Sequence, residues 1–210
     1  MDAREQLHVL GRTGDYPPFA GKIREIHKHP LTAKGIDIVQ INLGKRCNLS
    51  CRHCHVEAGP ERSEVMTQPV LEKCLEILQS SPISTIDITG GAPEMNPHLE
   101  WFLAGAAGLE RRLIVRSNLT LIGEEPYRHF LDVFVQNKVE IVTSLPDYVE
   151  AKSDRQRGAG VFRKIIAAMR ELNSRGYGMP GSGLVIDIVH NPVGAYLPGA
   201  QAALEHECRA

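Results

Sequence analysis

The strongest constraint on the fold is a repeated change of hydrophobic period along the chain. Short β-branched runs typical of buried strands occur at residues 36–43, 84–91, 112–118, 139–144 and 183–192. Apolar residues at helical spacing fill the intervals at residues 67–81, 96–109, 126–136 and 160–178. This alternation predicts a parallel sheet with covering helices, and right-handed crossovers curl such a sheet into an arc.

The length of the chain limits how far that arc can close. A full eight-unit barrel needs about 250 residues, whereas this chain has 210 residues and five expected strands. We therefore predict an α/β fold, a partial (β/α) TIM-like barrel with about five parallel strands. Residues 1–35 show no clear period and are interpreted as an N-terminal leader, and residues 36–210 as the core domain. The last segment, "AQAALEHECRA", looks like the beginning of a helix, so we expect the core to be incomplete at its C-terminus.

Charge and hydropathy exclude several classes of partner. The formal net charge is −1, which favours neither nucleic acid nor a membrane surface as a partner. The sequence contains no apolar run of the roughly 20 residues that a membrane span needs. The first residues lack the basic start and apolar stretch of a signal peptide. A cytoplasmic protein is the resulting expectation.

Three of the five cysteines fall within "RCNLSCRHCH", directly after the first expected strand. Cys47, Cys51 and Cys54 have the spacing C-x3-C-x2-C, and thiolates prefer zinc, copper(I) or iron–sulfur clusters. Three thiolates can hold three irons of a cubane cluster and leave the fourth iron open. Two alternatives remain: a zinc site that takes His53 or His55 as its fourth ligand, or buried free thiols.

Further candidates follow the other strands, because chemistry in parallel βα folds collects at the C-terminal strand ends. Glycines there allow close backbone approach to a ligand. Each candidate can equally be an ordinary turn residue or a solvated charge. The candidates are Gly90, Gly91 and Glu94 after the second strand, Asn118 after the third, Ser144 after the fourth, Arg157 ahead of the last helix and Asn191 after the fifth.

The cysteine triplet after a first strand resembles the hallmark of radical S-adenosylmethionine (radical SAM) enzymes. The resemblance implies a 4Fe-4S cluster held by Cys47, Cys51 and Cys54, a bound S-adenosyl-L-methionine, and an electron donor such as ferredoxin or flavodoxin. The segment "GGAPE" stands where that family has a Gly-Gly-Glu-Pro-like motif that meets the methionine amino group. Arg157 would pair with the cofactor carboxylate, since arginine favours bidentate contacts. The implied cofactor-binding set is His53, Gly90, Gly91, Glu94, Asn118, Ser144, Arg157 and Asn191.

Longer stretches, among them "QINLGKRCNLSCRHCHVEAGPERSEVM", "DITGGAPEMNPH" and "IVHNPVGAYLP", are similar to the arsenosugar biosynthesis radical SAM family over about residues 36–205. This resemblance implies transfer of an adenosyl group to a methylated trivalent arsenical. Ser117 and Asp147 stand where that family has cysteines, and its chains continue into a sixth strand and a further domain. The alternatives are a non-catalytic zinc or iron–sulfur module and a truncated, inactive homologue.

Overall fold

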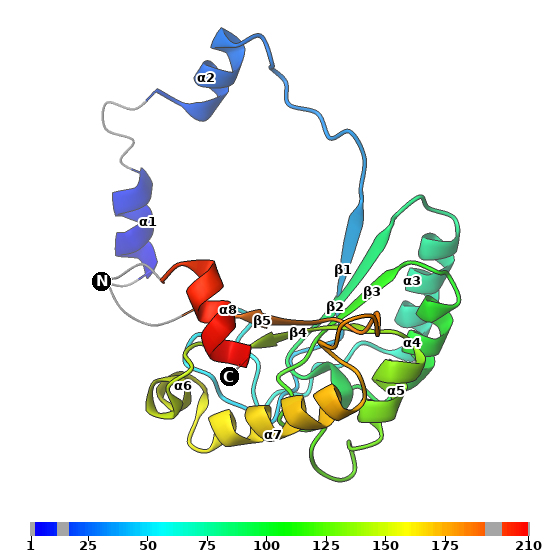
Figure 1. Ribbon diagram of the computed structural model, residues 1–210. Helices are drawn as coiled ribbons and strands as arrows, with labels where there is room; N and C mark the ends of the chain where they lie inside the picture. Colours follow the sequence, from blue (N-terminus) through cyan, green and yellow to red (C-terminus); the bar gives the residue numbers. More distant parts are fainter. Residues whose placement is uncertain (1–2, 12–16, 192–198, 210) are drawn as a thin grey trace. The chain divides into compact units, whose positions relative to one another are not determined.

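The computed structural model describes residues 3–11, 17–191 and 199–209, which fall into two compact units, residues 1–36 and 37–210. The first unit contains two short helices, α1 (Ala3–Gly11) and α2 (Phe19–Glu25) (Figure 1). These helices lie where the sequence shows no clear hydrophobic period. α2 buries none of its residues, so it needs no apolar stripe that a periodicity argument could detect.

The second unit is built on one five-stranded sheet. Its strands are all parallel and lie in chain order, β1-β2-β3-β4-β5. The predicted α/β fold, a partial barrel of five parallel strands, is therefore confirmed. Each strand is shorter than its hydrophobic run, and the bounds are β1 (Ile38–Asn42), β2 (Thr85–Thr89), β3 (Arg112–Arg116), β4 (Glu140–Ser144) and β5 (Ile186–Val189).

Helices cover the sheet between successive strands. Figure 1 shows α3, α4, α5 and α7 along one side of the sheet. The helices of this unit are α3 (Gln68–Gln79), α4 (Leu99–Ala107), α5 (Phe130–Gln136), α6 (Glu150–Arg157), α7 (Val161–Ser174) and α8 (Gln201–Arg209), with a 3-10 turn η1 at Pro93–Met95.

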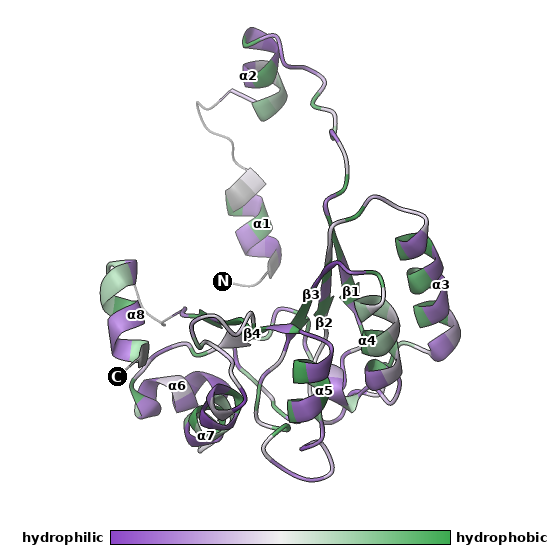
Figure 2. Cartoon of the chain, turned by 45° about the vertical axis from the view of Figure 1, so that its right-hand side comes forward, coloured by the Kyte–Doolittle hydropathy of each residue, from purple (hydrophilic) through white to green (hydrophobic). Residues whose placement is uncertain are grey.

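The hydrophobic core lies between the sheet and these helices. Ile86, Ile88 and Val115 are completely buried, as are Phe102 of α4 and Phe134 of α5. Figure 2 shows hydrophobic colours along the strands, whereas α3 and α5 carry both hydrophobic and hydrophilic bands. Each helix packs its apolar face against the sheet, and this packing fixes where the strand ends lie.

Two helices begin later than the sequence pattern predicts. The helix expected from residue 96 begins instead at Leu99, as α4. The Asn96 amide instead donates to the carbonyls of Leu43 and Met66, while its Oδ1 accepts from the His98 N–H. The helix expected from Pro126 begins at Phe130.

Helix α6 was not predicted at all. It is strongly hydrophilic and buries only Ser153, Gln156 and Arg157. A helix without an apolar stripe leaves no periodic signal in the sequence. It ends at Arg157, and the residue that caps it, Gly158, has a φ of 116°, in the region that favours glycine.

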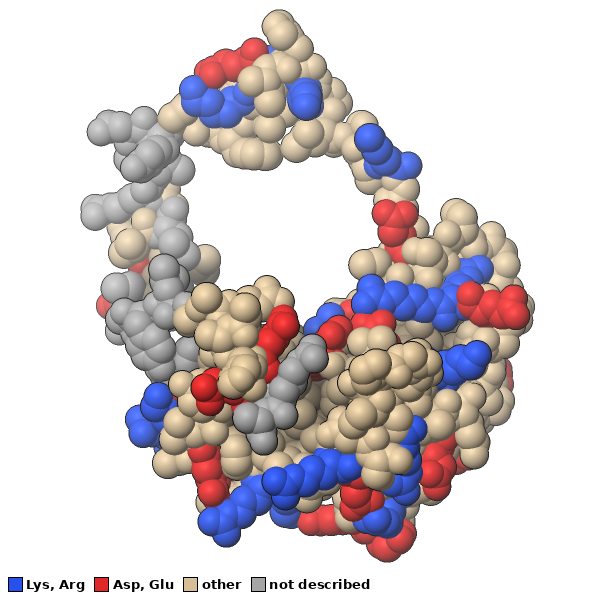
Figure 3. Space-filling model, in the orientation of Figure 1, with Lys and Arg blue, Asp and Glu red and all other residues tan. Residues whose placement is uncertain are grey.

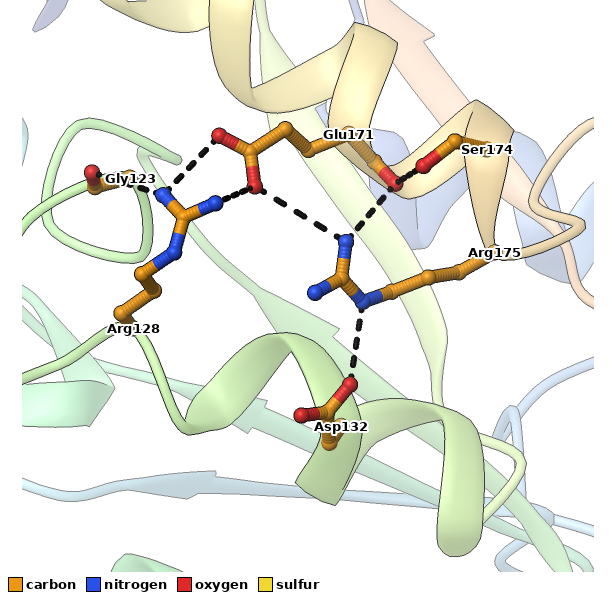
Figure 4. Close-up of polar contacts among 6 residues, drawn as sticks. All are labelled: Gly123, Arg128, Asp132, Glu171, Ser174 and Arg175. Carbon is orange, nitrogen blue, oxygen red and sulfur yellow. Dashed lines mark hydrogen bonds and ion pairs between the residues drawn. The ribbon is translucent and has the colours of Figure 1, made fainter.

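An ion-pair network joins α5 to α7 on the outside of the sheet (Figure 4). Arg175 Nε donates to Asp132 Oδ1 at 3.0 Å, and Arg128 makes a two-pronged contact with Glu171. Arg128 also donates to the Gly123 carbonyl at 3.3 Å. The network therefore ties the loop before α5, α5 itself and α7 into one outer layer.

The molecular surface carries charges of both signs. Basic and acidic side chains are interspersed on the face shown in Figure 3. Within the described residues, none of the helices combines the length and the apolar character needed to cross a membrane.

Candidate active site

The cysteine loop connects β1 to α3 and is closed at its base by backbone hydrogen bonds. Lys45 N donates to the Glu64 carbonyl at 2.9 Å, and Gly59 N donates to the Lys45 carbonyl at 3.1 Å. Met66 N returns to the Leu43 carbonyl at 2.8 Å. The loop thus begins and ends at the C-terminal edge of the sheet, and the three cysteines lie within it.

Hydrogen-bond donors point at two of the cysteine sulfurs. Cys47 Sγ accepts from Leu49 N at 3.4 Å and from Asn118 Nδ2 at 3.6 Å, and Cys54 Sγ accepts from Ala58 N at 3.2 Å. Burial raises the pKa of the Cys47 thiol, and the hydrogen bonds from Leu49 N and Asn118 oppose that rise. Such donors stabilise sulfur that carries negative charge, as it does when it binds a metal.

The segment that follows β2 supports the cysteine loop through backbone hydrogen bonds from Gly91 and Ala92. Gly91 N donates to the Gly44 carbonyl and Ala92 N to the Arg46 carbonyl, both at 2.9 Å. A Cβ at Gly91 would lie 2.4 Å from the Arg46 carbonyl oxygen. Gly91 is therefore required for close approach, as the sequence suggested, but the group that approaches it in this structure is the backbone of the cysteine loop.

Arg157, at the end of α6, lies beside the cysteines. It is 5% exposed, and its Nη1 donates to the Ser144 carbonyl at 2.8 Å. Its Nε is buried and has no hydrogen-bond partner within the described residues. Burial lowers the pKa of Arg157, and the nearby thiols of Cys51, Cys47 and Cys54 oppose this. A buried guanidinium with a free donor is a ready partner for an anionic ligand group.

The same helix end anchors the cysteine loop. Arg52 N donates to the Gln156 carbonyl at 3.0 Å, and the Arg157 carbonyl lies 4.0 Å from Cys51 Sγ. Burial raises the pKa of the Cys51 thiol, and the positive charge of Arg157 opposes that rise. Arg155, which lies two residues earlier on the same helix, is exposed.

Glu94 is buried rather than displayed. It is 3% exposed, the Ser117 hydroxyl donates to its Oε1, and its Oε2 has no hydrogen-bond partner within the described residues. Burial raises the pKa of this carboxyl, while the hydrogen bond from Ser117 lowers it. Ser117 and Asp147 are the two residues that stand where the arsenosugar family has cysteines. Ser117 donates its hydroxyl to Glu94. Asp147 accepts a hydrogen bond from Val149 N and forms an ion pair with Lys152 at 3.4 Å.

We expect Glu94 to make the stability of the protein depend on pH. Because its folded pKa is raised, its contribution is fully present below the ordinary glutamate pKa of about 4.3 and is lost as pH rises through the folded value. One such group changes the free energy of unfolding by at most about 1.4 kcal/mol per pH unit. When urea unfolding is measured as a function of pH, the part of the pH dependence that Glu94 contributes should be absent in Glu94→Gln. The exposed Glu61→Gln variant is the control, and an unchanged slope in Glu94→Gln would show that Glu94 does not titrate as described.

The remaining candidates divide between the site and the surface. Asn118 is buried against Cys47, and Ser144 contributes its carbonyl to Arg157. His53 lies exposed on the cysteine loop. Asn191 was predicted to end the fifth strand, but β5 ends at Val189 and Asn191 is exposed beyond it. The shorter strand reflects where pairing with β4 stops, at Ser144 and Val189.

Two residues that the sequence did not single out also belong to this site. Asn48 and Thr120 hydrogen-bond to Asn118 and to each other. Asn48 follows Cys47 directly, but polar loop residues are too common for that position to signal a role. Among the described residues, no three or more His, Cys, Asp or Glu side chains are arranged to hold a single metal ion.

This fold and loop define a known class of protein. The Radical SAM superfamily matches residues 41–191. The chain belongs to this superfamily. The resemblance drawn from the cysteine spacing is therefore confirmed at the level of the superfamily.

Curated relatives match part of the chain. The protein AlbA for biosynthesis of the antilisterial bacteriocin subtilosin, from Bacillus subtilis (strain 168), is 27% identical over 64% of this chain and 30% of its own length. The pre-heme d1 synthase of Dinoroseobacter shibae is 28% identical over 70% of this chain and 36% of its own length. The chain thus spans about a third of the length of these relatives.

Solved structures share the fold. Streptococcus suis SuiB bound to its precursor peptide SuiA matches 90% of this chain and 39% of SuiB, with a TM-score of 0.64 and 17% identity. The protein anSMEcpe with bound AdoMet matches 74% of this chain and 43% of its own, with a TM-score of 0.56 and 20% identity. At these identities the likeness establishes the fold alone.

Proposed function

We propose that the chain is the catalytic core of a radical SAM enzyme that binds a 4Fe-4S cluster through Cys47, Cys51 and Cys54. The observation that carries the proposal is the setting of the three thiols on one loop at the C-terminal sheet edge. Backbone and side-chain N–H groups point at two of the sulfurs, and the buried Arg157 guanidinium interacts electrostatically with all three thiols. This environment stabilises negative charge on sulfur, so the residues present suit a thiolate-ligated cluster.

The bound cluster would supply the electron for reductive cleavage of S-adenosyl-L-methionine into methionine and a 5′-deoxyadenosyl radical. The residues of the chain bind and orient the cofactor. Arg157 is proposed to pair with the carboxylate of the methionine part through its free, buried Nε. The other proposed cofactor-binding residues are Gly90, Gly91, Glu94, Asn118, Ser144, His53 and Asn191. Of these, Gly91 and Asn118 also hydrogen-bond to the cysteine loop.

We further propose a methylated trivalent arsenical as the substrate and a ferredoxin or flavodoxin as the electron donor. The support is the resemblance of long stretches of the chain, including "DITGGAPEMNPH", to the arsenosugar biosynthesis family. In this reaction the bond between sulfur and the 5′ carbon of S-adenosyl-L-methionine would break with one electron from the donor, and methionine would leave. The 5′ carbon would then bond to arsenic, and one electron given up by arsenic would return to the cluster, so that arsenic passes from the trivalent to the pentavalent state.

The test is anaerobic reconstitution with iron and sulfide, followed by S-adenosyl-L-methionine, dithionite and a methylated trivalent arsenical. We expect close to four irons per chain and an adenosylated arsenical, or 5′-deoxyadenosine when the arsenical is left out. Both iron and product should be lost in Cys51→Ala and kept in Cys74→Ala, because Cys74 lies on α3 outside the loop.

Each part of the proposal has its own contradicting outcome. One zinc per chain, and no iron, would favour a non-catalytic metal module. A cluster without cleavage would favour an inactive homologue, and 5′-deoxyadenosine without any arsenical product would leave the cofactor reaction standing and remove the substrate.

A further inference from the structure

Three polar side chains form a closed ring of hydrogen bonds next to Cys47. Asn118 Nδ2 donates to Asn48 Oδ1 at 2.9 Å, Asn48 Nδ2 donates to Thr120 Oγ1 at 2.8 Å, and Thr120 Oγ1 donates to Asn118 Oδ1 at 2.7 Å. The ring joins the cysteine loop to the segment after β3, about 70 residues further along the chain. Asn118 and Thr120 are 8% and 1% exposed.

The orientation of the Asn118 amide is determined by its neighbours. Its Oδ1 also accepts from the Thr120 backbone N–H at 2.9 Å. Turning the amide over would place its NH2 group against that N–H, donor facing donor. The oxygen is therefore fixed toward Thr120, and the NH2 group toward the cysteine loop.

The NH2 group has two hydrogens, and the ring uses only one of them. The second is directed at Cys47 Sγ, 3.6 Å from Nδ2. The other donor to this sulfur is the Leu49 N–H, which belongs to the loop itself. Asn118 thus reaches this sulfur from the segment after β3, and each donor and acceptor of its amide has a partner.

We propose that Asn48, Asn118 and Thr120 act as a clasp, which holds the cysteine loop against the end of β3 and fixes one amide hydrogen on the Cys47 sulfur. Asn118 is then a positioning residue that sets the reduction potential of a cluster bound by Cys47. This second part rests on the proposed function. A reduced cluster carries one more negative charge than an oxidised one, so a donor on its ligand sulfur favours the reduced state. The amide is neutral and supplies this effect without adding a counter-charge.

The test compares Asn118→Ala and Thr120→Val with the control Thr143→Val. Thr143 is buried and its hydroxyl has no hydrogen-bond partner within the described residues, so its loss removes no clasp contact. At one fixed solution potential, the ratio of reduced to oxidised cluster, measured by electron paramagnetic resonance, should fall about 2- to 10-fold in Asn118→Ala. Thr120→Val should give a smaller fall in the same direction, and Thr143→Val none. An unchanged ratio in Asn118→Ala at full iron content would overturn the tuning role.

The clasp itself is tested in the protein before iron is added. Trypsin can cut the cysteine loop after Arg46 and Arg52, and a loop released from β3 should be cut faster. We expect cleavage there to be several-fold faster in Asn118→Ala than in the wild type or Thr143→Val. Equal rates would overturn the clasp. This measurement needs no cluster. If the wild type fails to bind iron, the proposed function is refuted, and the cleavage rates still show whether the clasp holds the cysteine loop.

Discussion

Replacing Gly91 with alanine should prevent the cysteine loop from reaching its position and lower the iron bound on reconstitution by more than about 10-fold. The added Cβ would lie 2.4 Å from the carbonyl oxygen and 2.8 Å from the carbonyl carbon of Arg46. These are backbone atoms and cannot turn aside as a flexible side chain can. The neighbouring hydrogen bond from Ala92 N to the same carbonyl would be strained as well. Iron and sulfide analysis after anaerobic reconstitution measures the effect.

The matched control is Gly123→Ala. A Cβ at Gly123 would meet no atom within 4 Å, so this variant should bind iron like the wild type. Overpacking at Gly91 is also expected to cost about 1–3 kcal/mol of unfolding free energy, and circular dichroism separates a folded protein with a displaced loop from an unfolded one. Full iron content in a folded Gly91→Ala protein would contradict the close approach described here.

Replacing Arg157 with methionine should weaken binding of S-adenosyl-L-methionine to the reconstituted protein by about 10- to 100-fold, the range expected for a lost hydrogen bond to a charged group. Methionine keeps much of the buried volume but removes the guanidinium. The variant also loses the contact from Nη1 to the Ser144 carbonyl, while it no longer buries a charge. Equilibrium dialysis with the reconstituted protein measures the affinity.

The control for this prediction lies two residues earlier on the same helix. Arg155 is exposed, so Arg155→Met changes the same net charge without touching the site. If both variants weaken binding equally, Arg157 acts only through overall charge, and its proposed pairing with the cofactor carboxylate is wrong. Arg157→Lys should be impaired too, since an ammonium group does not reproduce the planar fork of arginine.

Local pattern was sufficient to predict the parallel sheet and the covering helices α3, α4, α5 and α7. The runs around Ile86 and Ile141 are β-branched and buried, and the amphipathic stretch beginning at Val161 has one apolar face. Each of these signals depends only on residues close together in the chain, and a parallel sheet is the arrangement that buries them all. The cysteine triplet was readable for the same reason, because its spacing lies within eight residues.

Only the tertiary structure assigned partners to the polar residues of the site. The sequence gives no sign that the Glu94 carboxylate accepts a hydrogen bond from Ser117, which directly follows β3. Asn48 carries no recognisable signal in the sequence, because its hydrogen-bond partners Asn118 and Thr120 lie about 70 residues away and meet it only in the folded chain. Helix α6, which carries Arg157, has no apolar stripe and so left no periodic signal. A hydrogen bond between residues 70 positions apart depends on how the strand ends converge, and no local repeat in the sequence records that convergence.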